Sequence, residues 1–433
     1  MSLTGVPLEL LMIALAIGSI GGAAWLWPRL SLPWPAQLAE RLGLILLTQV
    51  FATAAVLTFL NDYLSLIGSW SELLGTGPQR HAWTASPPPQ FRASPVAITG
   101  ATIGVSFGRS TLPPQVAKGL LTGSPSGSAV AAAAARSGVV LRVTIHGEYT
   151  GITTGSDYVY LPPQYFMPGY AAMRFPLVLA FTGYPNEPLD LMRLLYLPGT
   201  AARLVAHGRA QPAIYVMANP SVALPRDTEC TNVPAGPQVA TFFGRDLPLA
   251  LERTFRVNPG RSGWGAIGYS TGAYCAVKMA MLYPGQFSAA VGLSGYYVAL
   301  KDLTTGNIYG GSPGYRDEND LDWRLSHLPA PPISVLAAST ASGEETLPGT
   351  LTFLHLIRPP MRGYSLILRQ GGHNYFTWRR ELPQSLSWLS ARLRPAVASG
   401  GRQAGLSGSV GVSAGNQIRN VVEPGWLASD TSP

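Results

Sequence analysis

The sequence predicts an α/β protein in which a mostly parallel sheet carries helices on both faces, preceded by two N-terminal transmembrane helices. Between about residues 138 and 395, short apolar runs alternate with stretches of helical character. Two long apolar runs lie near the N-terminus, the first with a single charge, Glu9, at its edge and the second uncharged. Only 12% of the 433 residues are charged, whereas soluble proteins average about a quarter. This deficit indicates that part of the chain lies in lipid.

The membrane anchor is expected within residues 1–75, with spans at about 8–27 and 43–60. An α-helix of roughly 20 apolar residues crosses a bilayer core of about 30 Å. Trp25 and Trp27 then lie where interfacial aromatic residues are found. A cleaved signal peptide fits poorly, since no basic segment precedes the first run and no small-residue cleavage site follows it. A buried hairpin in a soluble core is the other alternative.

The distribution of basic residues predicts the orientation. The connector between the two runs carries Arg29 and Arg41, whereas no Lys or Arg precedes the first run. The positive-inside rule places such a connector in the cytoplasm, and the N-terminus and the bulk of the chain outside it. We therefore expect a multi-pass protein of the cell membrane with an extracytoplasmic catalytic domain.

Two segments flank the α/β region and differ from it in composition. Residues 76–137 are rich in Pro, Ser, Gly and Ala and read as a tether with a short strand-like piece around Ser106. Residues 396–433 lack an apolar period and are expected to form a disordered tail. The net charge of +8 comes without a run of Lys or Arg, so no nucleic-acid surface is predicted.

The catalytic domain is expected at 138–395. An antiparallel pair should open it, followed by apolar runs typical of strands buried on both faces. The expected strands cover 139–147, 157–165, 175–183, 212–220, 263–270, 287–295, 331–339 and 363–372. The expected helices cover about 189–206, 238–255, 271–283, 346–357 and 380–393.

The pattern G-x-S-x-G occurs four times, around Ser106, Ser270, Ser312 and Ser413. A nucleophilic serine needs a sharp turn between a buried strand and a helix, and only Ser270 has that context. Gly268 and Gly272 would remove side-chain clashes at such a turn. Ser270 is therefore the candidate nucleophile, and a glycine-lined helix start in an ordinary α/β protein is the alternative.

A serine hydroxyl needs a base, and His373 is the candidate. It follows the last expected strand in "LRQGGHNYFTW", at the sheet edge where chemistry gathers in open α/β folds. The remaining histidines lie in the tether, an opening strand, connections or a helix; they are His81, His146, His207, His327 and His355.

The triad acid should lie between the serine and the histidine in the chain. The loop "TASGEETL" offers Glu344 as first choice and Glu345 as its rival, and one of them can instead cap the following helix. The oxyanion hole is expected to use the backbone N–H of Thr271, directly after the nucleophile. The N–H of Tyr184, in the loop after the strand 175–183, should supply the second donor.

The motifs "LVLAFTGYP", "GAIGYSTGAYCA" and "GGHNYFTW" resemble the esterase D ("putative esterase") family of α/β-hydrolases. That family includes the antigen 85 mycolyltransferases and S-formylglutathione hydrolase. The resemblance covers about residues 138–395, and two N-terminal spans are similar to membrane-anchored actinobacterial members. It implies a Ser270, His373 and Glu344 or Glu345 triad. Thr182-Gly183 stands where many members have His-Gly, and the acid loop lacks their Gly-x-x-Asp pattern.

Cys230 and Cys275 are the chain's two cysteines, which is too few for a disulfide scaffold or a zinc cluster. A bond between them would hold the 221–235 loop over the catalytic edge. Two free thiols are the alternative.

The function expected from the sequence is a serine acyl-ester hydrolase or acyltransferase without cofactor or metal. Its substrate would be a small-molecule or lipid acyl ester. A non-catalytic envelope protein that uses the hydrolase fold as a binding scaffold is the second hypothesis. A peptidase is a third, although nothing in the sequence favours amides.

Overall fold

The computed structural model describes residues 6–30, 33–64, 73, 95–96, 103–106, 123, 134–155, 157–397 and 420–422. The chain forms two compact units. The first comprises residues 1–83, 340–345 and 368–377, and the second comprises the remainder. Most of the expected tether and tail, including His81 and Ser413, lies outside the described residues.

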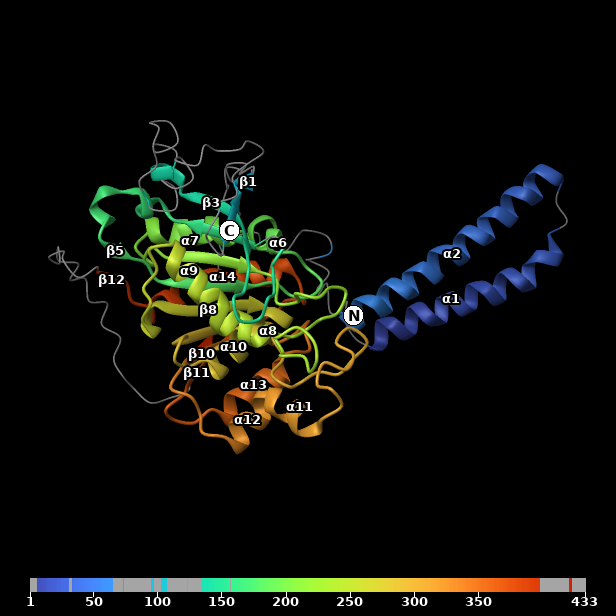
Figure 1. Ribbon diagram of the computed structural model, residues 1–433. Coiled ribbons are helices and arrows are strands. Elements are labelled where there is room, and N and C mark those ends of the chain that lie inside the picture. Colours follow the sequence, from blue (N-terminus) through green and yellow to red (C-terminus); the bar gives the residue numbers. More distant parts are fainter. Residues whose placement is uncertain are drawn as a thin grey trace, which may run out of the picture. The chain divides into compact units, whose positions relative to one another are not determined.

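The first unit contains two long apolar helices, α1 (Val6–Leu26) and α2 (Trp34–Leu64), which pack against each other and are shown side by side in Figure 1. The candidate spans measure 23 and 28 residues, and only 6% and 0% of their most apolar windows are buried. A helix in the core of a soluble protein would be mostly buried. By length and composition both helices can cross a membrane, a property that an N-terminal signal sequence shares.

The second unit is built on an 11-stranded sheet with the order β1-β2-β3-β4-β7-β6-β8-β9-β10-β11-β13. Strands β1 to β4 are antiparallel, and β4 pairs antiparallel with β7. From β7 through β6, β8 and β9 to β10 every pairing is parallel. The mostly parallel α/β sheet predicted from the sequence is therefore confirmed.

The strand bounds are β1 Pro95–Val96, β2 Ile103–Ser106, β3 Val139–Ile145, β4 Asp157–Leu161, β5 Met173–Arg174, β6 Leu177–Phe181, β7 Ile214–Ala218, β8 Trp264–Tyr269, β9 Ala289–Leu293, β10 Ser334–Thr340, β11 Arg362–Leu368, β12 Ala396–Val397 and β13 Asn420–Val422. The helices after α2 are α6 Pro188–Arg193, α7 Leu197–Ala206, α8 Val239–Thr241, α9 Leu247–Thr254, α10 Thr271–Leu282, α11 Pro313–Asn319, α12 Leu321–His327, α13 Leu347–Leu356 and α14 Tyr375–Ser390.

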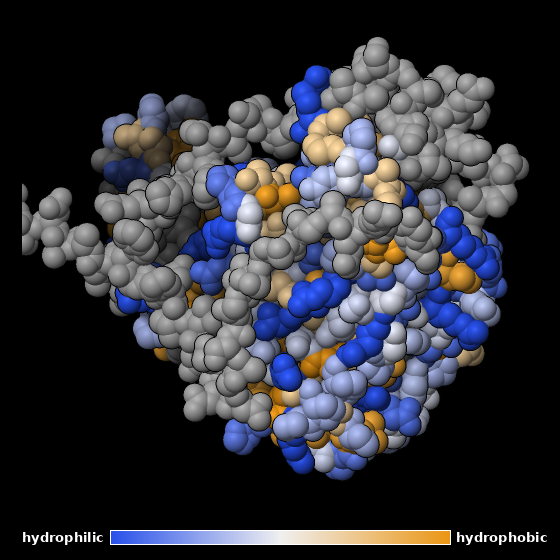
Figure 2. All heavy atoms as spheres, turned by 90° about the vertical axis from the view of Figure 1, so that its left-hand side faces the viewer, coloured by the Kyte–Doolittle hydropathy of each residue, from blue (hydrophilic) through white to orange (hydrophobic). Residues whose placement is uncertain are grey.

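The central strands are covered on both faces. Every residue of β6, β7, β8 and β9 is buried. Side chains alternate between the two faces of a strand, so complete burial requires helices on each side of the sheet. On the β5 and β12 side of the molecule, shown in Figure 2, polar and apolar residues are interspersed over the described surface.

Several elements differ from the sequence expectations. The helix expected at 189–206 is interrupted at Tyr196, whose φ of 57° separates α6 from α7. The stretch expected as one helix at 238–255 contains a π-helical turn at Phe242–Asp246 between α8 and α9. The short strand β13 pairs in parallel with β11, within the segment expected to be a disordered tail.

Helices α11 and α12 were not expected from the sequence. They lie in a polar stretch with Gly and Pro, which reads as loop when judged by composition alone. Each begins with a side-chain cap: Ser312 accepts a hydrogen bond from the Tyr315 N–H, and Asp320 accepts one from the Trp323 N–H. Ser312, one of the four serines in the repeated pattern, therefore caps a helix.

Candidate active site

Ser270 lies at the turn between β8 and α10 with φ 56° and ψ −127°. Such a conformation is strained for a residue that carries a Cβ. The turn is tight because Gly268 and Gly272 pass each other closely. A Cβ on Gly268 would collide with the Gly272 backbone, and a Cβ on Gly272 would collide with the Thr182 carbonyl oxygen. Both glycines are required by contacts, as the sequence pattern predicts for a nucleophile elbow.

The loop after β6 passes directly beside this turn. A Cβ built on Gly183 would lie 3.0 Å from the Ser270 Cβ and 3.0 Å from the Tyr269 ring. The Thr182 hydroxyl donates to the Asn186 carbonyl at 3.2 Å, and the Tyr184 hydroxyl donates to the Pro225 carbonyl at 2.6 Å. These bonds fix the chain around Tyr184, whose N–H was expected to face the reacting oxygen. A threonine at 182 therefore serves the local fold in place of the histidine common in the family.

The segments 340–345 and 368–377 belong to the first unit and are bonded to each other. The Ala341 N–H donates to the Leu368 carbonyl at 2.7 Å, and the Gly371 N–H donates to the Ser342 carbonyl at 3.1 Å. The Thr340 hydroxyl donates to the Gly371 carbonyl at 3.1 Å. Hydrogen bonds therefore join the loop that carries His373 to the loop that carries Glu344 and Glu345.

His373 faces Glu344 across this connection, with Nδ1 and Oε1 4.0 Å apart. The Glu344 side chain is fully buried, whereas 23% of the His373 side chain is exposed. Burial lowers the pKa of His373 to about 4, so its imidazole is neutral at pH 7 and can accept a proton. Glu345 is exposed. The structure therefore brings Glu344, rather than its neighbour, beside the histidine.

The other described histidines have local partners. His207 and His327 each interact through Nδ1 with a carbonyl one helical turn earlier, and His146 interacts with Thr153. His355 lies on the exposed side of α13. Within the described part of the chain, no group of three or more His, Cys, Asp or Glu side chains is arranged to hold a metal ion.

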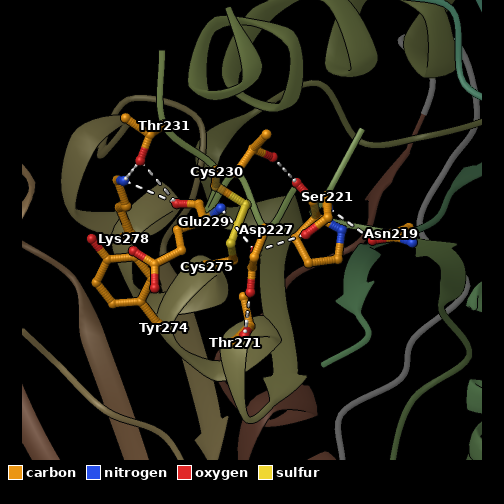
Figure 3. Close-up of a disulfide and its surroundings, with 12 residues drawn as sticks. Asn219, Ser221, Asp227, Glu229, Cys230, Thr231, Thr271, Tyr274, Cys275 and Lys278 are labelled. Atoms are coloured by element: carbon orange, nitrogen blue, oxygen red, sulfur yellow. Dashed lines mark hydrogen bonds between the residues drawn. A yellow bond between two sulfur atoms is a disulfide. The ribbon is translucent and has the colours of Figure 1, made fainter. Parts of the chain in front are cut away.

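A disulfide joins Cys230 to Cys275, with the Cα atoms 5.6 Å apart, and Figure 3 shows it between the loop that follows β7 and helix α10. Asp227 lies on the same loop. Its carboxylate accepts hydrogen bonds from the Ser221 hydroxyl at 2.7 Å and the Thr271 hydroxyl at 2.9 Å. Burial raises the pKa of Asp227. Thr271, the residue directly after Ser270, is thus held by a buried acid.

A buried polar cluster forms further contacts between the loop after β7 and α10. The Lys278 ammonium donates to the Glu229 carbonyl at 3.0 Å and to the Thr231 hydroxyl at 2.8 Å. The Glu229 carboxylate accepts from the hydroxyls of Tyr296 and Tyr309. Burial lowers the pKa of Lys278 and raises that of Glu229. The disulfide, the hydrogen bond between Thr271 and Asp227 and the hydrogen bonds of Lys278 therefore hold the loop after β7 against α10.

Sequence reasoning missed Asp227, Glu229 and Lys278. One signal was available for Lys278, because it stands alone in the apolar helical sequence "AYCAVKMAML". A lysine on a helix that is otherwise apolar must find buried acceptors. No comparable signal marks Asp227 or Glu229, because acidic residues in a polar loop are usually solvated.

The chain is similar in sequence or in fold to several known proteins. An uncharacterised protein of Corynebacterium glutamicum is 22% identical over 269 residues, which cover 59% of this chain and 62% of the relative, less than two thirds of its length. A ferulic acid esterase matches with a TM-score of 0.50 at 18% identity, over 59% of this chain and 98% of its own. An S-formylglutathione hydrolase from Agrobacterium tumefaciens also has a TM-score of 0.50, at 14% identity, over 59% and 95% of the two chains.

At these identities the solved structures establish the fold alone, that of the α/β-hydrolases. The family described as "Putative esterase" matches residues 156–323, a segment that includes the Ser270 elbow and ends before Glu344 and His373. Over that segment the chain resembles the esterase family, in agreement with the resemblance that its motifs carry.

Proposed function

We propose that the chain is a serine ester hydrolase or acyltransferase in which Ser270 is the nucleophile, His373 the base and Glu344 the acid. The observation that carries this proposal is the strained turn at Ser270, with the loop around Gly183 packed against it. Strain of this kind costs about 1–3 kcal/mol and persists where function requires it. The pairing of His373 with the buried Glu344 provides independent support.

In the proposed reaction, the Ser270 Oγ attacks the ester carbonyl carbon while His373 accepts the hydroxyl proton. The N–H groups of Thr271 and Tyr184 stabilise the oxyanion, and Glu344 stabilises the imidazolium. As the carbon–oxygen bond to the alcohol breaks, His373 protonates the departing oxygen, leaving an acyl group on Ser270. Water then releases an acid, or an acceptor alcohol takes the acyl group in a transfer reaction.

The test of this proposal is covalent labelling together with turnover. The full-length protein should react with a fluorophosphonate and hydrolyse p-nitrophenyl esters. Ser270→Ala should abolish labelling and lower kcat at least about 10³-fold, because the attacking atom is lost. Ser106→Ala is the matched control from the same sequence pattern and should retain both. A protein that folds but neither labels nor turns over any ester would indicate the non-catalytic scaffold instead.

We further propose that residues 1–75 anchor the protein in the cell membrane and that the catalytic domain, 138–395, lies outside the cytoplasm. The length and apolar composition of α1 and α2 support the anchor. The Cys230–Cys275 bond supports an oxidising compartment, where disulfides persist. Residues 76–137 would link the two parts, with β2 adding a strand to the sheet, and 396–433 would follow the domain as a tail.

A further inference from the structure

The side chain of Thr271 is buried beside the proposed nucleophile and bonded to an acid. Thr271 is the first residue of α10 and is only 5% exposed. Its hydroxyl donates to Asp227 Oδ2 at 2.9 Å and lies 3.3 Å from the Tyr296 hydroxyl. The first N–H groups of a helix have no partner within the helix. The contact with Asp227 therefore fixes this residue, and with it the direction of its N–H, from outside the helix.

Asp227 is itself held by several partners. It is 3% exposed. Besides the bond from Thr271, its Oδ1 accepts hydrogen bonds from the Ser221 hydroxyl at 2.7 Å and the Glu229 N–H at 3.1 Å. Its own N–H donates to the Thr304 carbonyl at 3.0 Å. Figure 3 shows Asp227 between Ser221 and Thr271. A carboxyl group with this many partners has little freedom to move, so it is a rigid support for Thr271.

The chain directly after Asp227 is strained. Glu229 and Cys230 have φ values of 44° and 49°, in the left-handed region that side chains with a Cβ disfavour. Strain of this kind persists only where the surroundings fix it, and it gathers at functional sites. Here the surroundings are the disulfide to Cys275 and the hydrogen bond from the Lys278 ammonium to the Glu229 carbonyl. The loop is therefore held in the one conformation that places Asp227 against the start of α10.

The negative charge of Asp227 is not what helps the proposed reaction. A carboxylate close to the oxyanion hole opposes the negative charge that develops on the reacting oxygen. Burial raises the pKa of Asp227, which favours the neutral form and weakens this repulsion. What the acid supplies is a hydrogen-bond acceptor at a fixed place, and that contribution is geometric.

Geometry decides the strength of an oxyanion hole. Its donors act at about 2.7–3.1 Å from the oxyanion, and loss of one donor lowers kcat by roughly 10²–10³-fold. We propose that Asp227 is a positioning residue for the proposed oxyanion hole: through the Thr271 hydroxyl, it holds the Thr271 N–H toward the reacting oxygen. This role rests on the ester chemistry proposed for Ser270.

The test uses the full-length protein with p-nitrophenyl butyrate as substrate and 1,1,1-trifluorohexan-2-one as inhibitor. Rates are expressed per active site, counted by fluorophosphonate labelling. The ketone adds to a nucleophilic serine as a hemiketal oxyanion, so its Ki reports on the oxyanion hole without a leaving group. Asp227→Ala should lower kcat/KM and raise Ki by the same factor, about tenfold, which is part of the loss expected for a missing donor. The change should lie in kcat more than in KM, because the donor acts in the transition state.

Two further variants test the hydrogen bond itself. Thr271→Val removes the hydroxyl but keeps the N–H and the shape of the side chain, and it should match Asp227→Ala. The double variant should be no worse than either single variant, because all three lack the same bond. Asp227→Asn keeps an amide that can donate to the Thr271 hydroxyl oxygen, so it should recover most of the loss. If Asp227→Ala does not fold, Thr271→Val decides the outcome.

Asp246→Ala is the matched control for a purely structural effect. Asp246 is 2% exposed and accepts hydrogen bonds from the N–H groups of Tyr149 and Thr150 and from the Thr150 hydroxyl. Its loss should lower the Tm and leave kcat/KM and Ki unchanged. Wild-type kcat/KM and Ki in the folded Asp227→Ala and Thr271→Val proteins would overturn the positioning role and leave the ester chemistry standing. A wild-type protein that neither turns over the ester nor binds the ketone would reject the ester chemistry, and this role with it.

Discussion

Ser270 adopts a backbone conformation that glycine tolerates far more easily than serine. A glycine at position 270 would relieve this strain but would lack the hydroxyl. Two residues away on either side, Gly268 and Gly272 carry no side chain because the neighbouring backbone leaves no space for one. At the scale of single residues, the turn therefore keeps a serine in a strained conformation between two positions that only glycine can occupy.

The pH dependence of turnover follows from His373. A base must be neutral, and burial lowers the pKa of this imidazole from 6.5 to about 4. Activity should therefore be retained as pH falls through 6.5 and decline only as it approaches 4, because the inactive protonated form gains population only there. The measurement is kcat/KM for a neutral ester between pH 3.5 and 8, with folding checked at each pH by circular dichroism. An acidic limb centred near 6.5 would show that the histidine is solvated in the working enzyme.

The two glutamates of the acid loop should behave differently. Glu344 is buried at 4.0 Å from His373, whereas Glu345 is exposed. Glu344→Gln should reduce kcat by roughly 10³–10⁴-fold, since the neutral amide no longer stabilises the imidazolium. Glu345→Gln, its immediate neighbour, should stay within about twofold of wild type. Steady-state kinetics of the two variants measure these kcat values. A large loss of kcat in Glu345→Gln but not in Glu344→Gln would assign the acid role to Glu345.

At the scale of elements, helix α10 is held to the loop after β7 along its first two turns. Thr271 bonds to Asp227, Cys275 to Cys230, and Lys278 to the backbone of Glu229. The loop contributes Asp227, which accepts hydrogen bonds from the Thr271 and Ser221 hydroxyls. Movement of this loop would therefore displace Thr271, whose N–H is a proposed donor of the oxyanion hole.

Removing the disulfide should destabilise the catalytic domain. The bond closes a loop with a sequence separation of 45, for which chain entropy gives up to about 4 kcal/mol. A Cys230→Ser/Cys275→Ser protein should unfold about 5–10 °C below the wild type in a calorimetric scan. A reducing agent should lower the wild-type Tm by a similar amount and leave that of the double variant unchanged. Equal melting temperatures for oxidised wild type and double variant would contradict a stabilising bond.

At the scale of the whole molecule, periodicity and motif context were sufficient to predict the parallel sheet, the strand–turn–helix at Ser270 and the two apolar helices. Apolar runs such as "LVLAF" indicate buried strands, and the glycines around Ser270 indicate a turn. The break at Tyr196 and the burial of Asp227 were missed because tertiary contacts set them. Helices α11 and α12 were missed because their polar stretch reads as loop by composition, although each carries a local cap. Strand β13 was missed because an edge strand depends on its neighbour β11 more than on its own sequence.

The orientation in the membrane is a prediction that concerns the molecule as a whole. Arg29 lies between α1 and α2, Arg41 lies within the N-terminal part of α2, and no Lys or Arg stands before α1 in the sequence. The connector should therefore be cytoplasmic and both ends of the chain external. Epitopes inserted after Leu30 and at the C-terminus can be probed with impermeant antibody on intact spheroplasts. We expect the antibody to reach only the C-terminal epitope on intact spheroplasts and both epitopes after permeabilisation.

Because the bias rests on two charges, Arg29→Ala/Arg41→Ala with lysines added before Val6 should reverse the pattern. Loss of an N-terminal tag with release of the protein from membranes would instead identify α1 as a cleaved signal sequence.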